Sequence, residues 1–329
     1  MRLTGREGIL QIHPTRRCNL SCLHCYSESG PGAREELALG TLLAVVTDAA
    51  ELGYTVLSVS GGEPLMYRPL PLLLAHARAH AMRTLVTTNG TLTSSRHLEP
   101  IAAHLDLLAL SLDGPPADHD EMRARPGAFD TLASRMDDVR AAGITFGFLF
   151  TLTQHNVHQL DWAVRFALEQ KASLLQIHPL EASGRASGMA DSVPDEIECA
   201  AAVLEVARLR HEVGDQLRVH LDLTVRAALP HSPMSAEDHD PSAAFARLVS
   251  PLVVEPDGRC VPLEYGFPAS FALGDVTEHR LSVLAATWRD TVLPRFQRLV
   301  ADVHHTLTAE DGPLVANWYA ETTRAARSR

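Results

Sequence analysis

Short runs of apolar and β-branched residues alternate with amphipathic helical patterns over the first half of the chain. This alternation constrains the fold most strongly, because successive strands joined by helices pair in parallel. Six such units predict an α/β fold, a partial (β/α)6 TIM-like barrel with helices on its outer face. The predicted strands cover residues 9–13, 55–60, 83–88, 107–112, 145–152 and 173–178. Two of the helices expected between them, over residues 38–53 and 128–143, end in glycine.

The pattern changes after residue 190. The polar, turn-rich stretch 229–242 is a candidate domain boundary, and a Pro-Asp-Gly turn within 250–266 predicts a hairpin beyond it. We therefore predict a core domain over residues 1–228 and a smaller α+β domain over residues 229–329. The other elements expected here are a helix over 194–214, a strand over 217–223 and helical segments over 281–300 and 313–327.

Composition excludes several classes of protein. The net charge of −11 opposes a nucleic-acid surface, since phosphate binding needs clustered positive charge. The sequence has no apolar run of the roughly 20 residues that a membrane span needs. Its first residues also lack the apolar region of a signal peptide, so we expect a cytoplasmic protein. A reducing cytoplasm keeps thiols unpaired, which suits metal binding.

Three of the five cysteines lie close together directly after the first predicted strand. Cys18, Cys22 and Cys25 have the spacing C-x₃-C-x₂-C. Three thiolates on one short loop can bind three irons of a [4Fe–4S] cluster and leave the fourth iron open. Zinc bound by three cysteines and either His13 or His24 is the competing interpretation.

Further polar and glycine-rich motifs follow the next predicted strands. The sequence GGEP follows the second strand, NGT the third and DGPP the fourth. The carboxyl ends of parallel strands open onto one rim, where the chemistry of such folds gathers. We therefore expect these motifs to lie beside the cysteine loop.

The cysteine run and the rim motifs together resemble the radical S-adenosylmethionine (SAM) enzymes. CNLSCLHCY resembles the family signature, and SGGEP, TTNGT and SLDG are similar to its strand-end motifs in the same order. Residues 151–156 and 178–186 are similar to the fifth and sixth strand endings of the subgroup that carries a SPASM domain. The resemblance covers residues 8–190 and implies a [4Fe–4S] cluster on the three cysteines, with SAM on its open iron. The residues that it places at the SAM site are Tyr26, Gly61, Gly62, Glu63, Pro64, Thr88, Asn89, Ser111, Asp113 and Arg185.

The segment 250–276 resembles the opening of a SPASM domain. Leu263 stands where the family has a cysteine, and no cysteine follows Cys260. The resemblance therefore implies a degenerate SPASM-like domain without auxiliary iron–sulfur clusters, retained as a cap over the barrel. Cys260 is a candidate hydrogen-atom donor to a substrate radical, and a small buried hydrophobe is the alternative interpretation.

The function implied is reductive cleavage of SAM to a 5′-deoxyadenosyl radical that abstracts hydrogen from a substrate C–H bond. We expect maturation of a ribosomally made peptide. The alternatives are epimerisation, dehydrogenation, elimination or decarboxylation of a sugar, nucleoside or cofactor precursor, and a non-enzymatic zinc or cluster sensor. An external one-electron reductant such as flavodoxin or ferredoxin is expected. Since the sequence before residue 9 offers no leader-binding segment, a separate peptide-recognition protein is a candidate partner.

Overall fold

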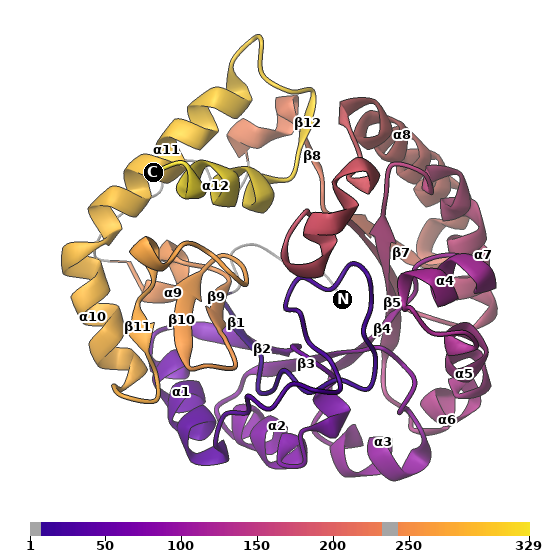
Figure 1. The fold of residues 1–329 in the computed structure, drawn as a ribbon, viewed down its shortest axis with the longest axis horizontal. Coiled ribbons are helices and arrows are strands. Elements are labelled where there is room, and N and C mark those ends of the chain that lie inside the picture. Colours follow the sequence, from indigo (N-terminus) through magenta and orange to yellow (C-terminus); the bar gives the residue numbers. More distant parts are fainter. Residues whose placement is uncertain (1–7, 232–242) are drawn as a thin grey trace.

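The computed structural model describes residues 8–231 and 243–329. Its main sheet has ten strands in the order β11-β10-β9-β1-β2-β3-β4-β5-β6-β7. The pairs from β1 to β7 are all parallel, and Figure 1 shows the sheet curved inside a ring of helices. The predicted α/β fold and partial barrel are therefore confirmed. The parallel strands are β1 Gly8–Ile12, β2 Tyr54–Val59, β3 Arg83–Thr88, β4 Leu107–Ser111, β5 Phe146–Leu152, β6 Leu174–Pro179 and β7 Arg218–Leu221.

Helices join the parallel strands along the outside of the sheet. They are α1 Leu39–Glu51, α2 Leu70–Ala79, α3 Ser95–Ala102, α4 Pro116–Met122, α5 Ala128–Ser134, α6 Met136–Ala141, α7 Leu160–Glu169 and α8 Glu196–Val213. The single helix predicted over 128–143 was wrong, because α5 and α6 are separate. At their junction the Arg135 N–H donates to the Leu132 carbonyl, three residues back, at 3.0 Å, which tightens the turn.

The C-terminal segment adds strands to the same sheet. The predicted hairpin is present as β9 Leu252–Val254 and β10 Arg259–Pro262, with β11 Gly274–Asp275 beside it. Strand β9 also pairs in parallel with β1. Residues on both sides of the predicted boundary at 228/229 thus share one sheet and one hydrophobic core. The division into two domains stays a prediction, and residues 232–242 of the predicted boundary loop lie outside the described part.

The remaining helices pack around this C-terminal extension. They are α9 Phe245–Leu248, α10 Leu281–Thr291, α11 Leu293–Thr308 and α12 Trp318–Arg327. The helical stretch predicted over 281–300 is two helices, because Pro294 lies in the first turn of α11 and cannot donate a hydrogen bond back into α10. The start of the stretch predicted as helical over 313–327 instead forms β12 Val315–Ala316, which pairs with β8 Thr224–Val225.

The two faces of the curved sheet differ in burial. Along β1, β3 and β6, buried residues alternate with partly exposed ones. The buried set, such as Leu10, Val86 and Ile177, packs with helix residues in the core. The other set, which includes Gln11 and His178, therefore faces the inside of the barrel. Within residues 8–231 and 243–329, no helix has the length and apolar character to cross a membrane.

Candidate functional site

The cysteine loop lies at the carboxyl end of β1, as predicted. Cys18 and Cys22 are buried and Cys25 is half-buried. Cys18, Leu20 and Cys22 form a small hydrophobic cluster, separate from the main core, with Cys25 packed against it. Burial raises the pKa of the Cys18 thiol to about 12. A metal that binds this sulfur must therefore displace a proton.

All three sulfur atoms have hydrogen-bonding neighbours, and Ser27 Oγ lies 3.5 Å from Cys25 Sγ. The Leu20 N–H donates to Cys18 Sγ at 3.5 Å, and the Asn89 side-chain amide donates to it at 3.8 Å. The Arg123 guanidinium donates to Cys22 Sγ at 3.7 Å. Hydrogen bonds of this kind stabilise thiolate and tune iron–sulfur clusters. The donor set therefore fits a cluster bound by three cysteines.

Zinc fits these side chains less well. The described residues contain no group of three or more His, Cys, Asp or Glu side chains arranged around a single ion. A cubane cluster does not need that arrangement, because each thiolate binds a different iron. Each of the two histidines considered as zinc ligands has its Nε2 near another side chain, and its Nδ1 is buried without a hydrogen-bond partner in the described residues. His13 Nε2 lies 2.8 Å from Gln11 Nε2, and His24 Nε2 lies 3.8 Å from Asp113.

Gly61 and Gly62 lie against the stem of the cysteine loop. The Gly62 N–H donates to the Thr15 carbonyl at 2.8 Å, and the Glu63 N–H donates to the Arg17 carbonyl at 2.9 Å. Gly61 has a φ of +114°, and a Cβ on Gly62 would overlap the Arg17 carbonyl. The two glycines thus let the end of β2 pack directly on the loop that carries the cysteines. Their close approach to a ligand stays a prediction.

Gly62→Ala is expected to displace the cysteine loop, because the added methyl group overlaps the Arg17 backbone. We expect iron bound after anaerobic reconstitution to fall several-fold, with a loss of about 2 kcal/mol in the free energy of unfolding from overpacking. Iron analysis and chemical denaturation measure the two effects. Gly32→Ala is the matched control, since a Cβ there meets no atom within 4 Å. Equal iron loading in both variants would contradict the prediction.

Glu63 connects the ends of β2 and β3. It is completely buried, and its Oε1 accepts from the Thr88 hydroxyl at 2.7 Å and from the Leu65 N–H at 3.1 Å. Its Oε2 accepts from the Asn89 N–H at 2.9 Å. Burial raises the pKa of this carboxyl. Its predicted contact with SAM stays a prediction. Pro64 begins the short 3₁₀ segment Pro64–Met66 that follows.

Asn89 links the end of β3 to the cysteine loop. Its side-chain amide donates to Asn19 Oδ1 at 2.9 Å, in addition to its contact with Cys18. Its Oδ1 accepts from the Thr91 N–H at 3.0 Å. The predicted neighbourhood of the NGT motif and the cysteines is therefore present.

Asp113, after β4, forms a buried ion pair that sequence analysis missed. The Arg123 Nε lies 2.7 Å from Asp113 Oδ2, and both side chains are at most 7% exposed. Although burial by itself raises the pKa of Asp113, the Arg123 guanidinium holds it below the usual value. Arg123 directly follows α4 as its C-cap residue, and no motif in the sequence marks it. Ser111, on β4, lies close to this pair in sequence and is also buried.

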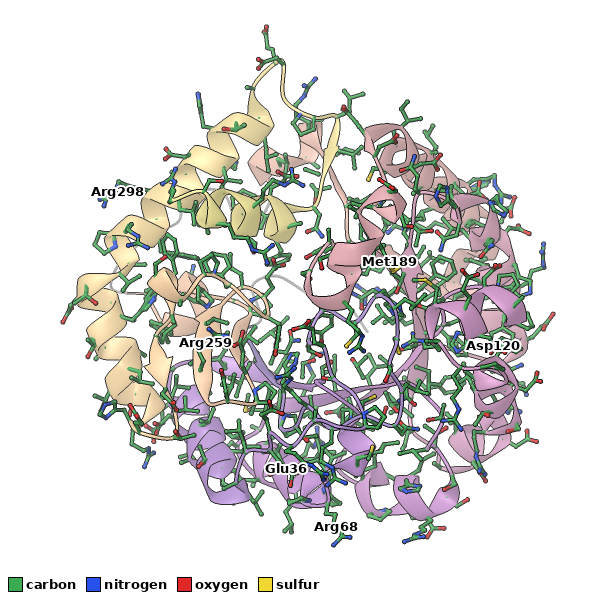
Figure 2. The ribbon with its side chains drawn as sticks, in the orientation of Figure 1. Glu36, Arg68, Asp120, Met189, Arg259 and Arg298 are labelled. Carbon is green, nitrogen blue, oxygen red and sulfur yellow. The ribbon has the colours of Figure 1, made fainter. Side chains whose placement is uncertain are left out.

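Arg185 and Gly184 hold the far side of the cysteine loop. The Arg185 Nε donates to the Cys22 carbonyl at 2.8 Å, and its terminal nitrogen donates to the Ser29 carbonyl at 2.8 Å. The Arg185 N–H donates to the Cys25 carbonyl at 3.0 Å. Figure 2 shows this 3₁₀ segment, Gly184–Ser192, beside the loop, with Met189 labelled on it. Arg185 was predicted at the SAM site and is engaged here by backbone carbonyls of the cysteine loop.

Three aromatic rings meet at Tyr26. The Tyr26 hydroxyl lies 3.2 Å from Ser60 Oγ. The ring of Tyr265 lies 5.5 Å from the ring of Tyr26 and 4.9 Å from that of His13, between ring centres. Tyr265 follows β10, so the C-terminal segment reaches the cysteine loop. Tyr265 lies in the segment 250–276 that resembles the opening of a SPASM domain, and no role was predicted for it.

Cys260 lies apart from this set. It is on β10, completely buried, and belongs to the main hydrophobic core rather than to the cysteine cluster. Burial raises its pKa, so the thiol stays protonated at neutral pH. This environment favours packing, and the hydrogen-donor role stays a prediction.

The chain is similar to known proteins over this part of the fold. Residues 12–167 match the model of the Radical SAM superfamily. Fe-coproporphyrin III synthase of Methanosarcina barkeri is 34% identical over 214 residues, which are 64% of this chain and 54% of that protein. PqqA peptide cyclase of Xanthomonas campestris is 29% identical over 209 residues, 62% of this chain and 56% of that protein. The chain thus spans about half the length of these curated relatives.

A solved structure shares the fold over nearly the whole chain. It is native anSMEcpe with bound AdoMet and Cp18Cys peptide, with a TM-score of 0.66 and 17% sequence identity. The match covers 97% of this chain and 95% of that one. At this identity the likeness concerns the fold, including the C-terminal strands and helices beyond the barrel.

Proposed function

We propose, from the premise that this chain carries a radical SAM domain over residues 12–167, that it cleaves SAM reductively and abstracts hydrogen from a substrate. The observation that carries the proposal is the loop of Cys18, Cys22 and Cys25, in which polar hydrogens are directed at the buried sulfurs of Cys18 and Cys22. A cluster bound by these cysteines would pass on an electron from the external donor and would offer the open iron that SAM cleavage needs.

The chain's own part in this reaction is to hold and shield the loop. Gly62 and Glu63 fix its stem, Asn89 and Arg123 direct hydrogens at sulfur, and Arg185 binds its far side. These residues follow four different strands: Gly62 and Glu63 come after β2, Asn89 after β3, Arg123 after β4 and α4, and Arg185 after β6. Such positioning and exclusion of water are what a protein contributes to cofactor chemistry.

The substrate that we propose is a ribosomally made peptide. Two observations support it: the similarity to PqqA peptide cyclase, and a fold shared with an enzyme whose structure holds a peptide. The similarity to Fe-coproporphyrin III synthase favours a second candidate, a tetrapyrrole or another cofactor precursor. We propose a cytoplasmic location, a one-electron donor such as flavodoxin or ferredoxin, and a separate protein that recognises the peptide.

Release of 5′-deoxyadenosine tests both the activity and the substrate class. The iron-loaded, reduced protein is incubated with SAM and with extract fractions above and below about 2 kDa, a size that separates peptides from most metabolites. Stimulation by a protease-sensitive large fraction supports the peptide. Stimulation by the small fraction alone supports the cofactor precursor. Absence of any SAM cleavage at full iron loading contradicts the proposed activity.

Cys260→Ala separates the packing role of this residue from the hydrogen-donor role. Because the side chain is completely buried in the core, we expect the free energy of unfolding to fall by about 1 kcal/mol. SAM cleavage and the yield of modified substrate should stay at the level of the unaltered protein. If SAM is cleaved but the substrate product is lost or replaced, the donor role is supported instead.

A further inference from the structure

A group of polar side chains on the inner face of the sheet has no part in holding the cysteine loop. His178 lies on β6 and Glu181 just after it, and Asp222 follows β7. Glu264, after β10, and Asn317, before α12, approach the same place. Leu175, Ile177 and Pro179 of β6 are buried, and Leu175 and Ile177 pack in the core. His178, which lies between Ile177 and Pro179, therefore faces inward.

Two sets of contacts place this group next to the cysteine loop. Tyr265, the neighbour of Glu264, packs its ring against Tyr26. Three and four residues after Glu181, Gly184 and Arg185 contact the loop, and the Arg185 N–H donates to the Cys25 carbonyl. A molecule bound at Glu181 and Glu264 would therefore lie near the expected source of the radical.

The charge of His178 is already matched by carboxylates. Its Nδ1 lies 3.1 Å from Asp222 and its Nε2 lies 3.5 Å from Glu181. Burial lowers the pKa of His178, but hydrogen bonds to Asp222 and Glu181 outweigh it and raise the pKa to about 10. Asp222 also accepts from the Gln176 amide at 2.7 Å. Both ring nitrogens of the imidazolium thus have a carboxylate neighbour, which leaves little for an anionic ligand.

Negative charge remains at Glu181 and Glu264. Burial, followed by the charge of Glu181, raises the pKa of Glu264 to about 7. The groups that face Glu264 are Glu181, His178, Tyr319, Thr323 and Arg327. In the described part of the chain, neither carboxyl forms an ion pair with a lysine or arginine. Three carboxyls, those of Glu181, Asp222 and Glu264, therefore share the charge of the one imidazolium of His178, with Arg327 as a further cation near Glu264.

A buried hydroxyl near Glu264 also lacks a good partner. The Thr323 side chain is 2% exposed and lies beside the Glu264 carboxyl. Its Oγ1 makes no hydrogen bond of standard geometry within the described residues. The Asn317 amide, in contrast, donates to Glu181 Oε1 at 3.1 Å and orients that carboxyl. The Thr323 hydroxyl and the carboxyl oxygens of Glu181 and Glu264 can therefore accept a hydrogen bond from at least one additional donor.

We propose that Glu181 and Glu264 bind a positively charged amino group of the substrate on the inner face of the barrel, beside the cysteine loop. This inference rests on the proposed function and narrows its substrate class to molecules that carry an ammonium or guanidinium group. A place in which the carboxyls of Glu181, Asp222 and Glu264 outnumber the nearby cations attracts such a group and repels carboxylates and phosphates. Each N–H of the ligand would donate to a carboxylate oxygen as a charge-assisted hydrogen bond.

Binding of a small amine to the iron-loaded full chain tests the site without SAM cleavage. The probe is n-hexylammonium, with n-hexanol as its uncharged counterpart, and ligand-observed NMR gives the affinities. We expect the ammonium to bind about tenfold more tightly than the alcohol, because one charge-assisted hydrogen bond contributes about that much to affinity. Glu181→Gln and Glu264→Gln should each weaken ammonium binding about fivefold or more. Glu99→Gln, an exposed carboxyl on α3, is the control and should bind like the unaltered protein.

The pH dependence of binding separates a local role of Glu264 from the general attraction of an acidic protein. A bound cation favours the ionised carboxyl, so affinity should rise about tenfold between pH 6 and pH 8, through the pKa of Glu264. Glu264→Gln should abolish this rise. Equal binding of amine and alcohol, or ammonium binding that neither variant weakens, would overturn the proposal. If the amine binds as expected while SAM is not cleaved, the proposed function is refuted, and the binding of a cation by Glu181 and Glu264 is supported.

Discussion

Replacing Cys18, Cys22 and Cys25 together with alanine is expected to abolish iron loading and the release of 5′-deoxyadenosine. The three thiols come from one loop, and each would bind a separate iron, so their loss removes every protein ligand of the cluster. Iron should fall from about four atoms per chain, the content of a [4Fe–4S] cluster, to background. Iron analysis, the visible absorption spectrum and 5′-deoxyadenosine release measure the result.

The fold should survive this triple change. The cysteine cluster is separate from the main hydrophobic core, so the helical circular dichroism should be retained. Cys199→Ala is the matched control, because this half-buried cysteine lies on α8. It should load iron and cleave SAM like the unaltered protein. Retention of four irons and of SAM cleavage in the triple variant would place the cluster elsewhere and refute the assignment.

Arg123→Leu is expected to lower the free energy of unfolding by about 3–5 kcal/mol. The substitution leaves the Asp113 carboxylate buried without its ion-pair partner, and an unpaired buried charge is costly. It also removes the guanidinium hydrogens directed at Cys22 Sγ, so iron loading should fall as well. Chemical denaturation under anaerobic conditions and iron analysis of the reconstituted protein measure the two effects.

Two further variants identify the cause. Asp113→Asn combined with Arg123→Leu removes both charges and should recover a large part of the lost stability, since no uncompensated charge remains. Arg324→Leu breaks the exposed ion pair with Glu321 and should change stability by less than about 1 kcal/mol. If Arg123→Leu is no more destabilising than Arg324→Leu, the buried ion pair contributes no more to stability than an exposed one.

The sequence predicted the barrel strands well because burial imposes a pattern on them. Residues such as Leu10 and Ile12 must pack under helices on the outer face, and this produces alternation that can be read without a structure. The cysteine spacing was equally informative, because three ligands of one cluster lie within eight residues. The split helices at Arg135 and before Pro294 were missed because a helical periodicity continues across a tightened or restarted turn.

What surrounds the cysteines depended on contacts between residues far apart in the sequence. Arg123 binds Asp113 and Cys22 only because α4 folds back over the loop. Tyr265 reaches Tyr26 because β9 pairs with β1 and so brings the C-terminal segment to the first strand. Arg123 and Tyr265 were given no role from the sequence, since an isolated arginine or tyrosine has the same local pattern on any surface.

The sequence by itself thus determined the parallel α/β barrel, the rim on which the motifs gather and the three candidate cluster ligands. These follow from local periodicity, from turn chemistry and from ligands that are neighbours in the chain. Only the tertiary structure decided that Gly62, Glu63 and Arg185 contact the cysteine loop. It also decided that Glu181 and Glu264, 83 residues apart, approach each other on the inner face. Their closeness comes from the curvature of the sheet and the pairing of β9 with β1, which no local pattern encodes.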